Sequence, residues 1–284
     1  MKTYNDIYIS SRKVLKQAGF EDCSMEARIL LAAAASKTEA ELIRDLNLYT
    51  TEEIEKRNED YVWRRLSGEP VAYITGKWEF YGLPIEVCKD VLIPRPDTEV
   101  LVETAKEIIT GSQSSARILD LCCGSGCISL ALASLFPAVK IVDIDISAAA
   151  LENARKNISA LGFSSKIICM QSDALSSTPM GIGMFDIIVS NPPYVPTAEI
   201  DSLSASVKDF EPVHALDGGS DGLKFYRSII KYWKSQLKSG GYIIFEVGEN
   251  QCDDVCSMLT SAGFSETDFR YDTAGIKRVV IGKY

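Results

Sequence analysis

Apolar and polar positions near the amino terminus follow the 3.6-residue period of amphipathic helices. In the first helix this spacing is carried by Tyr4, Ile7, Tyr8, Val14 and Leu15. A second helix, mostly apolar and therefore mostly buried, is predicted over Met25–Ala35 after Ser24. The helical pattern continues through the segment, so residues 1–68 are predicted to form a small helical bundle.

Two pairs of polar residues mark the starts of two further helices in this bundle. Thr38 with Glu41, and Thr50 with Glu53, have the spacing of a capping box, in which each side chain satisfies a free backbone N–H of the first helical turn. Gly68 is expected to end the last helix. The bundle as a whole carries no recognisable catalytic constellation.

Between residues 69 and 96 the pattern changes to short apolar runs that are interrupted by turn residues. Gly76, Gly82 and Pro84 separate the runs, which favours short strands and a hairpin. The apolar positions are Tyr73, Ile74, Trp78, Phe80, Tyr81, Ile85 and Val87. We interpret residues 69–96 as a connector between two domains that contains a β-hairpin.

From residue 97 onward, helical and strand patterns alternate. Asp97 or Thr98 is expected to cap a helix that runs to about Thr110, and residues 111–115 form a polar loop. Strands are predicted at Arg117–Leu121, Val139–Ile144, Lys166–Met170, Phe185–Ser190 and Tyr242–Val247, and helices at Cys127–Leu135, Ala148–Leu161, Leu223–Leu237 and Gln251–Ala262. This alternation predicts a parallel sheet with helices on both faces.

The last two predicted strands break the alternation. Asp268–Tyr271 and Arg278–Ile281 are separated only by a short turn, which can join only an antiparallel pair. A parallel sheet closed by an antiparallel hairpin resembles the class I S-adenosylmethionine-dependent methyltransferase fold, a Rossmann-like sheet of seven strands, and differs from a dehydrogenase. Residues 97–284 are therefore predicted to be an α/β methyltransferase catalytic domain.

Charge and hydropathy narrow the classes of function. The chain has 284 residues and a formal net charge of −9, whereas proteins that bind nucleic acid through phosphate contacts usually show a basic face. Its longest aliphatic run, Ile29–Ala35, is far shorter than the ~20 residues that cross a bilayer. The first 20 residues also lack a signal-peptide core. We therefore predict a cytoplasmic protein with a cationic cofactor or a protein partner, without membrane or direct nucleic-acid binding.

Eight cysteines and a single histidine raise the question of a metal site. No pair of C-x-x-C motifs is present. Cys122, Cys123 and Cys127 lie across a tight strand-to-helix turn and lack a nearby fourth ligand. We predict no metal, and reduced thiols that act as small buried apolar groups.

A glycine-containing turn follows the first predicted strand of the sheet. Its sequence, Asp120-Leu-Cys-Cys-Gly-Ser-Gly126, places small residues where the backbone can approach a ligand closely, and the helix after it presents free N–H groups. The turn alone is equally compatible with a purely structural role, since Ser129 replaces the third glycine of the dinucleotide pattern. Asp143 and Asp145, about 20 residues further on, supply the spacing at which a carboxylate binds ribose hydroxyls. Asp145 is the better placed at the strand tip.

The fourth predicted strand ends in Ser190-Asn-Pro-Pro-Tyr194. Two consecutive prolines fix φ and remove two backbone donors, which leaves carbonyls, the Asn191 amide and an aromatic ring at the strand end. The Asn191 Oδ1 and the Pro192 carbonyl can each accept one hydrogen of a planar NH₂ group, and Tyr194 can stack on it. A rigid turn would be the ordinary interpretation, but the motif follows a sheet whose other strand ends predict a cofactor site.

Asn191-Pro-Pro-Tyr194 resembles the signature of methyltransferases that act on planar amino groups. Longer motifs resemble one family among them, the peptide chain release factor glutamine methyltransferases, nearly end to end. These motifs are Gly68-Glu-Pro-Val-Ala-Tyr-Ile-Thr-Gly76, Glu79-Phe80, Leu92-Ile-Pro-Arg-Pro-Asp-Thr-Glu99 and Phe210-Glu-Pro212. The resemblance implies transfer of a methyl group from S-adenosylmethionine to the glutamine amide nitrogen (N5) in the Gly-Gly-Gln motif of class 1 translation release factors. It also implies that the helical domain recognises the release factor.

Site residues follow from this resemblance by position. Cys122 to Gly126 would surround the methionine portion of the cofactor, Asp145 would hold its ribose, and Asp173 would contact its adenine. The residues implied to bind the cofactor are Asp120, Cys122, Cys123, Gly124, Ser125, Gly126, Asp145, Asp173, Ala174 and Asn191. The glutamine would be bound by Asn191, Pro192, Pro193 and Tyr194. Of these, Asn191, Pro192 and Tyr194 would have the catalytic role.

The sequence departs from the family pattern at the cofactor turn and near the adenine. Cysteine stands at 122, where the family usually has glycine, and at 123, where it has a threonine-like residue; both tighten the turn without removing backbone donors. Ala174 stands where some relatives carry an aromatic residue.

Several alternatives stay open at this level. Glu79, Arg95, Asp97 and Glu99 either line the substrate entrance or form a salt-bridged hinge, and His214 is predicted to be a loop residue without a catalytic role. One rival function is a nucleic-acid adenine N6-methyltransferase, which would need a basic groove or a target-recognition domain. A second is a non-catalytic cofactor-binding adaptor, which would not need the two amide acceptors of the motif.

Overall fold

The computed structural model describes residues 2–111 and 115–284. Its residues cluster into two compact units, one comprising the described part of Met1–Lys77 with Ser204–Phe210, and the other Trp78–Leu203 with Glu211–Tyr284. Each unit has its own buried core. Within the described residues, no helix is long and apolar enough to span a bilayer.

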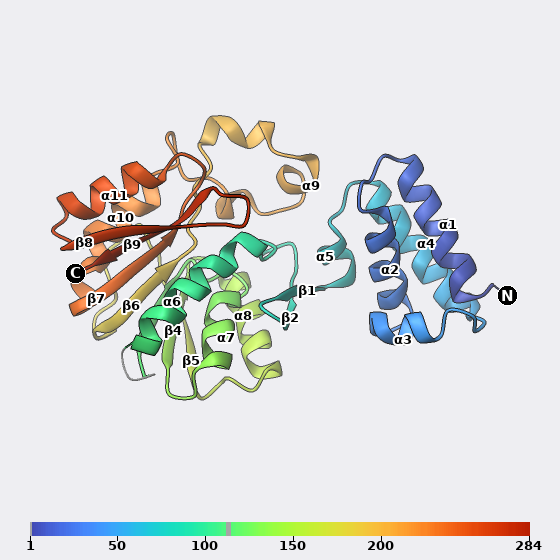
Figure 1. The fold of residues 1–284 in the computed structure, drawn as a ribbon, viewed down its shortest axis with the longest axis horizontal. Coiled ribbons are helices and arrows are strands. Elements are labelled where there is room, and N and C mark those ends of the chain that lie inside the picture. The colour runs from blue at the N-terminus through green and yellow to red at the C-terminus, as the bar shows by residue number, and fades with distance from the viewer. Residues whose placement is uncertain (1, 112–114) are drawn as a thin grey trace. The chain divides into compact units, whose positions relative to one another are not determined.

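The first unit is helical, as predicted. It contains α1 (Tyr4–Gln17), α2 (Cys23–Ala34), α3 (Glu39–Arg44), α4 (Glu52–Leu66), α5 (Val71–Thr75) and the short α9 (Ala205–Lys208) (Figure 1). Apolar side chains of α1, α2 and α3 meet in a core that includes Tyr4, Ile7, Leu31 and Leu42. The helical period therefore places one face of each of these helices against its neighbours.

Two details of this unit differ from the prediction. The capping box of Thr38 with Glu41 is present, but the next helix is capped by Thr51, whose hydroxyl accepts from the Ile54 N–H at 3.3 Å. Thr50 instead donates to the backbone carbonyl of Lys2. Tyr73 and Ile74, predicted in short strands, lie in α5, because Pro70 begins this helix and Gly76 ends it at a φ of +71°.

The predicted hairpin is present further along the connector. It consists of β1 (Lys77–Phe80) and β2 (Leu83–Glu86), which pair in a separate two-stranded sheet. The 3₁₀ turn η1 (Pro96–Thr98) then leads into α6 (Glu99–Gly111). Gly111 thus ends this helix rather than starting a loop, and the rest of the predicted polar loop lies largely outside the described residues.

The second unit is built around a seven-stranded sheet. Its strands are β3 (Arg117–Leu121), β4 (Lys140–Asp145), β5 (Ile167–Gln171), β6 (Phe185–Ser190), β7 (Leu237–Glu246), β8 (Glu266–Tyr271) and β9 (Lys277–Lys283). Their order is β5-β4-β3-β6-β7-β9-β8. β3 to β7 pair in parallel, whereas β9 is antiparallel to both β7 and β8, which confirms the predicted closing hairpin.

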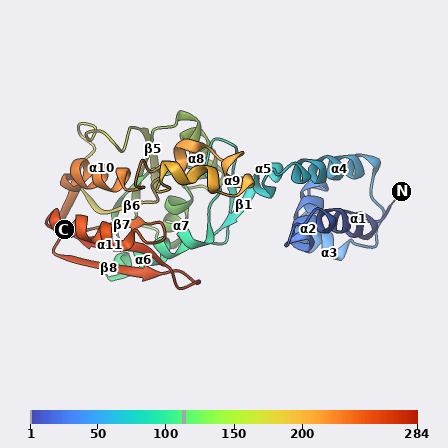
Figure 2. The ribbon, with the colours of Figure 1, turned by 90° about the horizontal axis from the view of Figure 1, so that it is seen from above.

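Helices cover both faces of this sheet. On one face, Tyr226 and Trp233 of α10 (Lys224–Trp233) and Val255 of α11 (Cys252–Ser261) pack in one core with Leu119 of β3. Asp120, the next residue of β3, points to the opposite face and reaches α7 (Cys127–Leu135). Figures 1 and 2 show α6, α7, α8 (Ala148–Ala160), α10 and α11 around the strands.

The sheet topology places the chemical residues at one edge. β3 lies between β4 and β6, so the chain turns in opposite directions on its two sides. Ligands of open α/β sheets bind at such a point, outside the carboxyl ends of the strands. The loops after β3, β4 and β6 carry the three predicted motifs and therefore meet at this edge.

Candidate functional site

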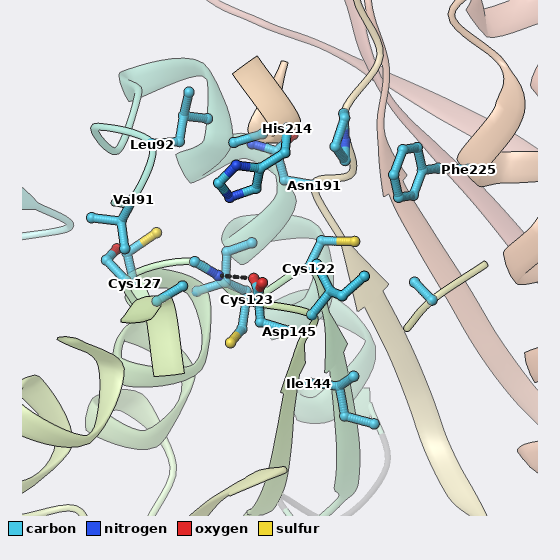
Figure 3. Close-up of a pocket in the computed structure, with 18 of the residues that line it drawn as sticks. Val91, Leu92, Cys122, Cys123, Cys127, Ile144, Asp145, Asn191, His214 and Phe225 are labelled. Atoms are coloured by element: carbon cyan, nitrogen blue, oxygen red, sulfur yellow. Dashed lines mark hydrogen bonds between the residues drawn. The ribbon is translucent and has the colours of Figure 1, made fainter. Parts of the chain in front are cut away.

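A cavity of about 300 Å³ lies at the carboxyl ends of β3, β4 and β6. Nine of the predicted site residues line it: Cys122, Cys123, Gly124, Ser125, Asp145, Asp173, Ala174, Asn191 and Pro193. Asp120, Gly126, Pro192 and Tyr194 are outside its lining. The structure thus brings most of the predicted cofactor and substrate residues to one cavity (Figure 3).

The turn after β3 has the left-handed backbone that its sequence suggests. Gly124 and Gly126 have φ values of +54° and +78°, and Cys122 adopts +61°. A Cβ at Gly126 would lie 3.4 Å from both the Ala154 Cβ and the Asp143 carboxylate, so glycine suits this position sterically as well. Cys122 occupies a conformation that L side chains rarely adopt, which is the backbone reason for a glycine at this position in the family that the chain resembles.

Asp145 holds the turn in place. Its Oδ2 accepts from the Gly124 N–H at 3.0 Å, and its Oδ1 accepts from the Ser147 N–H at 2.9 Å. Burial raises the pKa of this carboxyl, while the two backbone donors and nearby His214 oppose the rise. Figure 3 shows the carboxylate at the floor of the cavity, where its remaining lone pairs suit two ribose hydroxyls. These residues therefore fit the ribose of S-adenosylmethionine.

Asp120 and Asp143 form a buried pair beneath this turn instead of lining the cavity. The Ser129 hydroxyl contacts both carboxyls, Asp120 at 2.9 Å and Asp143 more closely. A hydroxyl has one hydrogen, so it can donate to one carboxyl only and must accept from the other. One of the two carboxyls therefore carries a proton, and burial raises the pKa of both. Asp120, predicted to contact the cofactor, supports the turn from below.

This pair predicts a measurable pH dependence of stability. A carboxyl whose pKa is raised in the folded state keeps a proton that the unfolded chain releases at about pH 4, so stability falls as pH rises from there toward neutrality. Asp120→Asn removes one such carboxyl and is expected to raise the free energy of unfolding at pH 8 by on the order of 1–3 kcal/mol and to flatten its slope between pH 5 and 8. Thermal unfolding across this range measures it.

Asp254→Asn, which alters an exposed carboxylate of α11, is the matched control. Its free energy of unfolding should depend on pH with the same slope as that of the wild type. An Asp120→Asn variant with the wild-type slope would show that the buried pair is ionised in the folded state.

The Asn191-Pro-Pro-Tyr194 segment follows β6 at the edge of the cavity. The Asn191 Nδ2 donates to the Thr98 Oγ1 at 3.1 Å, and both prolines are buried. Tyr194 packs against the core of the sheet, and its hydroxyl lies 3.4 Å from the Glu246 Oε1. Its stacking on the substrate amide stays a prediction, as do the Pro192 carbonyl contact and the adenine contacts of Asp173 and Ala174.

Several cavity residues were not found by sequence reasoning. His214 of η3 (Val213–Ala215), Thr98 and Phe225 all line the cavity, although they come from distant parts of the chain. Figure 3 shows the His214 ring beside Asn191, above Asp145. Two motifs gave local signals: Thr98 lies within Leu92–Glu99, and His214 lies near Phe210-Glu-Pro212, whose Glu211 is buried and forms an ion pair with Arg95.

The four charged residues left open in the connector have different places. Arg95 lines the cavity and pairs with Glu211, while Asp97 lies 3.6 Å from the Arg278 guanidinium. Glu99 accepts from the Tyr81 N–H at 2.9 Å and does not line the cavity, nor does Glu79. Of these four residues only Arg95 lines the cavity, whereas Asp97 and Glu99 contact Arg278 and the Tyr81 backbone.

The cysteines are all free thiols, and Cys122, Cys123 and Cys127 line the cavity. Burial raises the pKa of all three, which keeps them protonated at neutral pH. Among the residues that the structure describes, no three His, Cys, Asp or Glu side chains converge in a way that would hold a metal ion.

Comparison with known families matches both parts of the chain. The family model described as methyltransferase small domain matches residues 96–207, and the one described as PrmC N-terminal domain matches residues 6–76. Among solved structures, the catalytic domain of hMettl16 in complex with MAT2A 3′UTR hairpin 6 has a TM-score of 0.59 at 16% identity, covering 78% of this chain and 81% of that one. A methyltransferase from Pyrococcus furiosus has a TM-score of 0.53 at 16% identity, covering 79% and 98%. These two structures show the class I methyltransferase fold.

Curated relatives are far closer in sequence. A protein of Clostridium acetobutylicum named release factor glutamine methyltransferase is 38% identical over 97% of this chain and 96% of its own length. Proteins of the same name from Bradyrhizobium diazoefficiens and Geobacter sulfurreducens are 40% and 37% identical, covering 94% and 96% of this chain and 90% and 94% of their own lengths. The chain therefore belongs to the release factor glutamine methyltransferase family.

Proposed function

We propose that this protein methylates the N5 amide nitrogen of the glutamine in the Gly-Gly-Gln motif of class 1 release factors, with S-adenosylmethionine as the methyl donor. The observation that carries the proposal is the position of Asn191 on the same cavity as Asp145 and the Cys122–Gly126 turn. An acceptor for a planar amide thus lines the same cavity as the residues that fit the cofactor. The names of the relatives supply the choice of release factor as substrate.

The chemistry required is methylation of a weak nucleophile, since the lone pair of an amide nitrogen is delocalised into its carbonyl. S-adenosylmethionine supplies an electrophilic methyl group on a sulfonium. The Asn191 Oδ1 and the Pro192 carbonyl accept the two amide hydrogens, which aims the nitrogen and stabilises the positive charge that develops on it. One of these hydrogens then leaves to water as a proton. The cavity thiols, protonated because they are buried, do not compete as nucleophiles.

The domain assignment completes this proposal. Residues 97–284 supply catalysis, residues 69–96 connect, and residues 1–68 recognise the release factor away from the glutamine. The helical unit exposes large apolar side chains, of which Trp63 is 67% exposed and Tyr49 is 71% exposed, and such residues are common in protein interfaces. A substrate that acts in translation supports the prediction of a cytoplasmic protein.

A nucleic-acid adenine N6-methyltransferase is the alternative, because adenine also presents a planar NH₂ group. The net charge of −9 favours the release factor, since proteins that bind nucleic acid through phosphate contacts usually show a basic face. The likeness to hMettl16 shows the fold alone and leaves the substrate open.

Mass spectrometry of a purified release factor incubated with this protein and S-adenosylmethionine tests the proposal. We expect a single gain of ~14 Da that maps to the Gly-Gly-Gln glutamine and is absent with Asn191→Ala. Methylation of adenine in DNA or RNA, with an unmodified release factor, would instead establish the alternative. No methylation of the release factor, of DNA or of RNA would support a non-catalytic adaptor.

A further inference from the structure

A buried carboxylate lies behind the Asn-Pro-Pro-Tyr segment and is not used by the chemistry above. Glu246 is the last residue of β7 and is 1% exposed. Burial raises its pKa to about 7, although the Thr98 hydroxyl, the nearby Arg278 guanidinium and Tyr194 oppose the rise. The nearby Asp97 carboxylate adds to it. The polar neighbours that oppose the rise reduce the free-energy cost of ionising a carboxyl in a buried place.

The donors around this carboxylate can be assigned individually. Its Oε1 faces the Tyr194 hydroxyl at 3.4 Å. Its Oε2 has no hydrogen-bond partner among the described residues, and the Thr98 hydroxyl is the neighbouring hydroxyl that lowers the pKa of this carboxyl. Thr98 is 1% exposed and its hydroxyl has a single hydrogen. When that hydrogen is directed at the carboxylate, the Thr98 oxygen can only accept from its other neighbour.

That other neighbour is Asn191, whose Nδ2 lies 3.1 Å from the Thr98 Oγ1. An asparagine amide presents a donor on one edge and an acceptor on the other, and the two orientations are nearly equal in shape. Only the NH₂ edge can face a Thr98 oxygen that accepts. The Asn191 Oδ1 is then left free as the acceptor.

We infer that Thr98 and Glu246 form a relay that fixes the direction of the Asn191 side-chain amide, so that its carbonyl oxygen faces the substrate amide. Reversal of Asn191 would present an NH₂ group to the NH₂ group of the substrate, where two donors meet and neither is satisfied. Thr98 and Glu246 act through Asn191 and are therefore positioning residues. That the substrate amide belongs to a glutamine rests on the proposed function, whereas the orientation of the Asn191 side chain does not.

The first test measures Asn191 without any substrate. Its side-chain ¹⁵N–¹H signals are assigned in asparagine-labelled protein at pH 8 by their loss in Asn191→Asp. We expect one of the two amide hydrogens to be shifted and slow to exchange in the wild type and in Thr98→Ser, and to lose both properties in Thr98→Val. Identical Asn191 signals in the wild type and Thr98→Val would overturn the inference.

The second test uses methyl transfer to a release factor. Thr98→Val is expected to lower kcat by about 10–100-fold with the Kd for S-adenosylmethionine within threefold of wild type, whereas Thr98→Ser restores kcat. Thr104→Val is the matched control, because the buried Thr104 hydroxyl donates to the Val100 carbonyl of its own helix at 2.7 Å. A kcat loss in Thr104→Val equal to that in Thr98→Val, or a failure of Thr98→Ser to restore kcat, would show a merely structural role for Thr98.

Glu246 is tested by Glu246→Gln, whose side chain can donate to Thr98 as well as accept from it. We expect this variant to double or broaden the Asn191 amide signals and to lose part of kcat. A single wild-type signal with wild-type kcat would exclude Glu246 from the relay. If the wild-type chain shows the predicted Asn191 signals but leaves the release factor unmodified, the relay stands and the proposed substrate is wrong.

Discussion

Asn191→Ala is expected to lower kcat for methylation of the release factor glutamine by about 10²–10³-fold while the Kd for S-adenosylmethionine stays within threefold of wild type. The magnitude is that of removing one preorganised hydrogen-bonding group that stabilises charge in a transition state. Asn191 lies at the substrate side of the cavity, and its amide is held by Thr98 rather than by the cofactor turn. Its loss therefore removes an acceptor for the amide hydrogen and leaves the Asp145 region intact.

Single-turnover kinetics at saturating release factor, together with calorimetric titration of S-adenosylmethionine, separate the two quantities. The variant should also unfold near the wild-type temperature, because Asn191 is only partly buried. Equal losses in kcat and in cofactor affinity would contradict the assignment of Asn191 to the substrate amide. Such losses would indicate that Asn191 belongs to the cofactor-binding site instead.

Asp145→Ala is expected to have the opposite signature, a Kd for S-adenosylmethionine raised by about 10²–10⁴-fold. Hydrogen bonds to a charged group contribute about 1.5–3 kcal/mol each, and the carboxylate can accept from two ribose hydroxyls. The same variant also leaves the Gly124 and Ser147 N–H groups without their acceptor, which loosens the turn. The affinity of the wild-type protein for S-adenosylmethionine should weaken as pH falls through the raised pKa of Asp145, because the protonated carboxyl accepts fewer hydrogen bonds.

Asp145→Asn keeps one acceptor oxygen and should lie between alanine and the wild type. Asp254→Ala, on the exposed side of α11, serves as the control for loss of a carboxylate and should bind the cofactor normally. An Asp145→Ala variant that binds S-adenosylmethionine within threefold of wild type would remove Asp145 from the ribose site.

The elements of the sheet were predictable because each is encoded by a local pattern. The predicted bounds of β3, α7 and β6 match the structure, and the closing antiparallel pair was expected from the short link between its strands. The errors fall where two local signals compete. Tyr73 and Ile74 are β-favouring residues, but Pro70 and Gly76 delimit one turn of helix around them.

Within the site, residues that follow directly from a motif were predictable, whereas the orientation of each side chain was not. Strand alternation puts Asp143 and Asp145 on one side, and Asp145 was favoured for its place at the strand tip; in the structure Asp143 is buried against Ser129 and Asp145 lines the cavity. Asp120 was expected to contact the cofactor because of its place in the motif, but its side chain points to the face of the sheet that α7 covers. Strand alternation determines the face of a side chain, and the helix that covers that face determines what it meets.

The sequence by itself determined the fold class, the order of strands and helices, the family, and the three loops that carry chemistry, because these depend on periodicity, turn residues and motifs read within a few positions. Only the tertiary structure decided which distant residues complete the cavity. Thr98 and His214 reach Asn191 from segments far from it in sequence, and Glu246 lies behind them at the end of β7. Such encounters result from parallel strand pairing, which aligns the carboxyl ends of strands that are remote in the chain and leaves no local pattern.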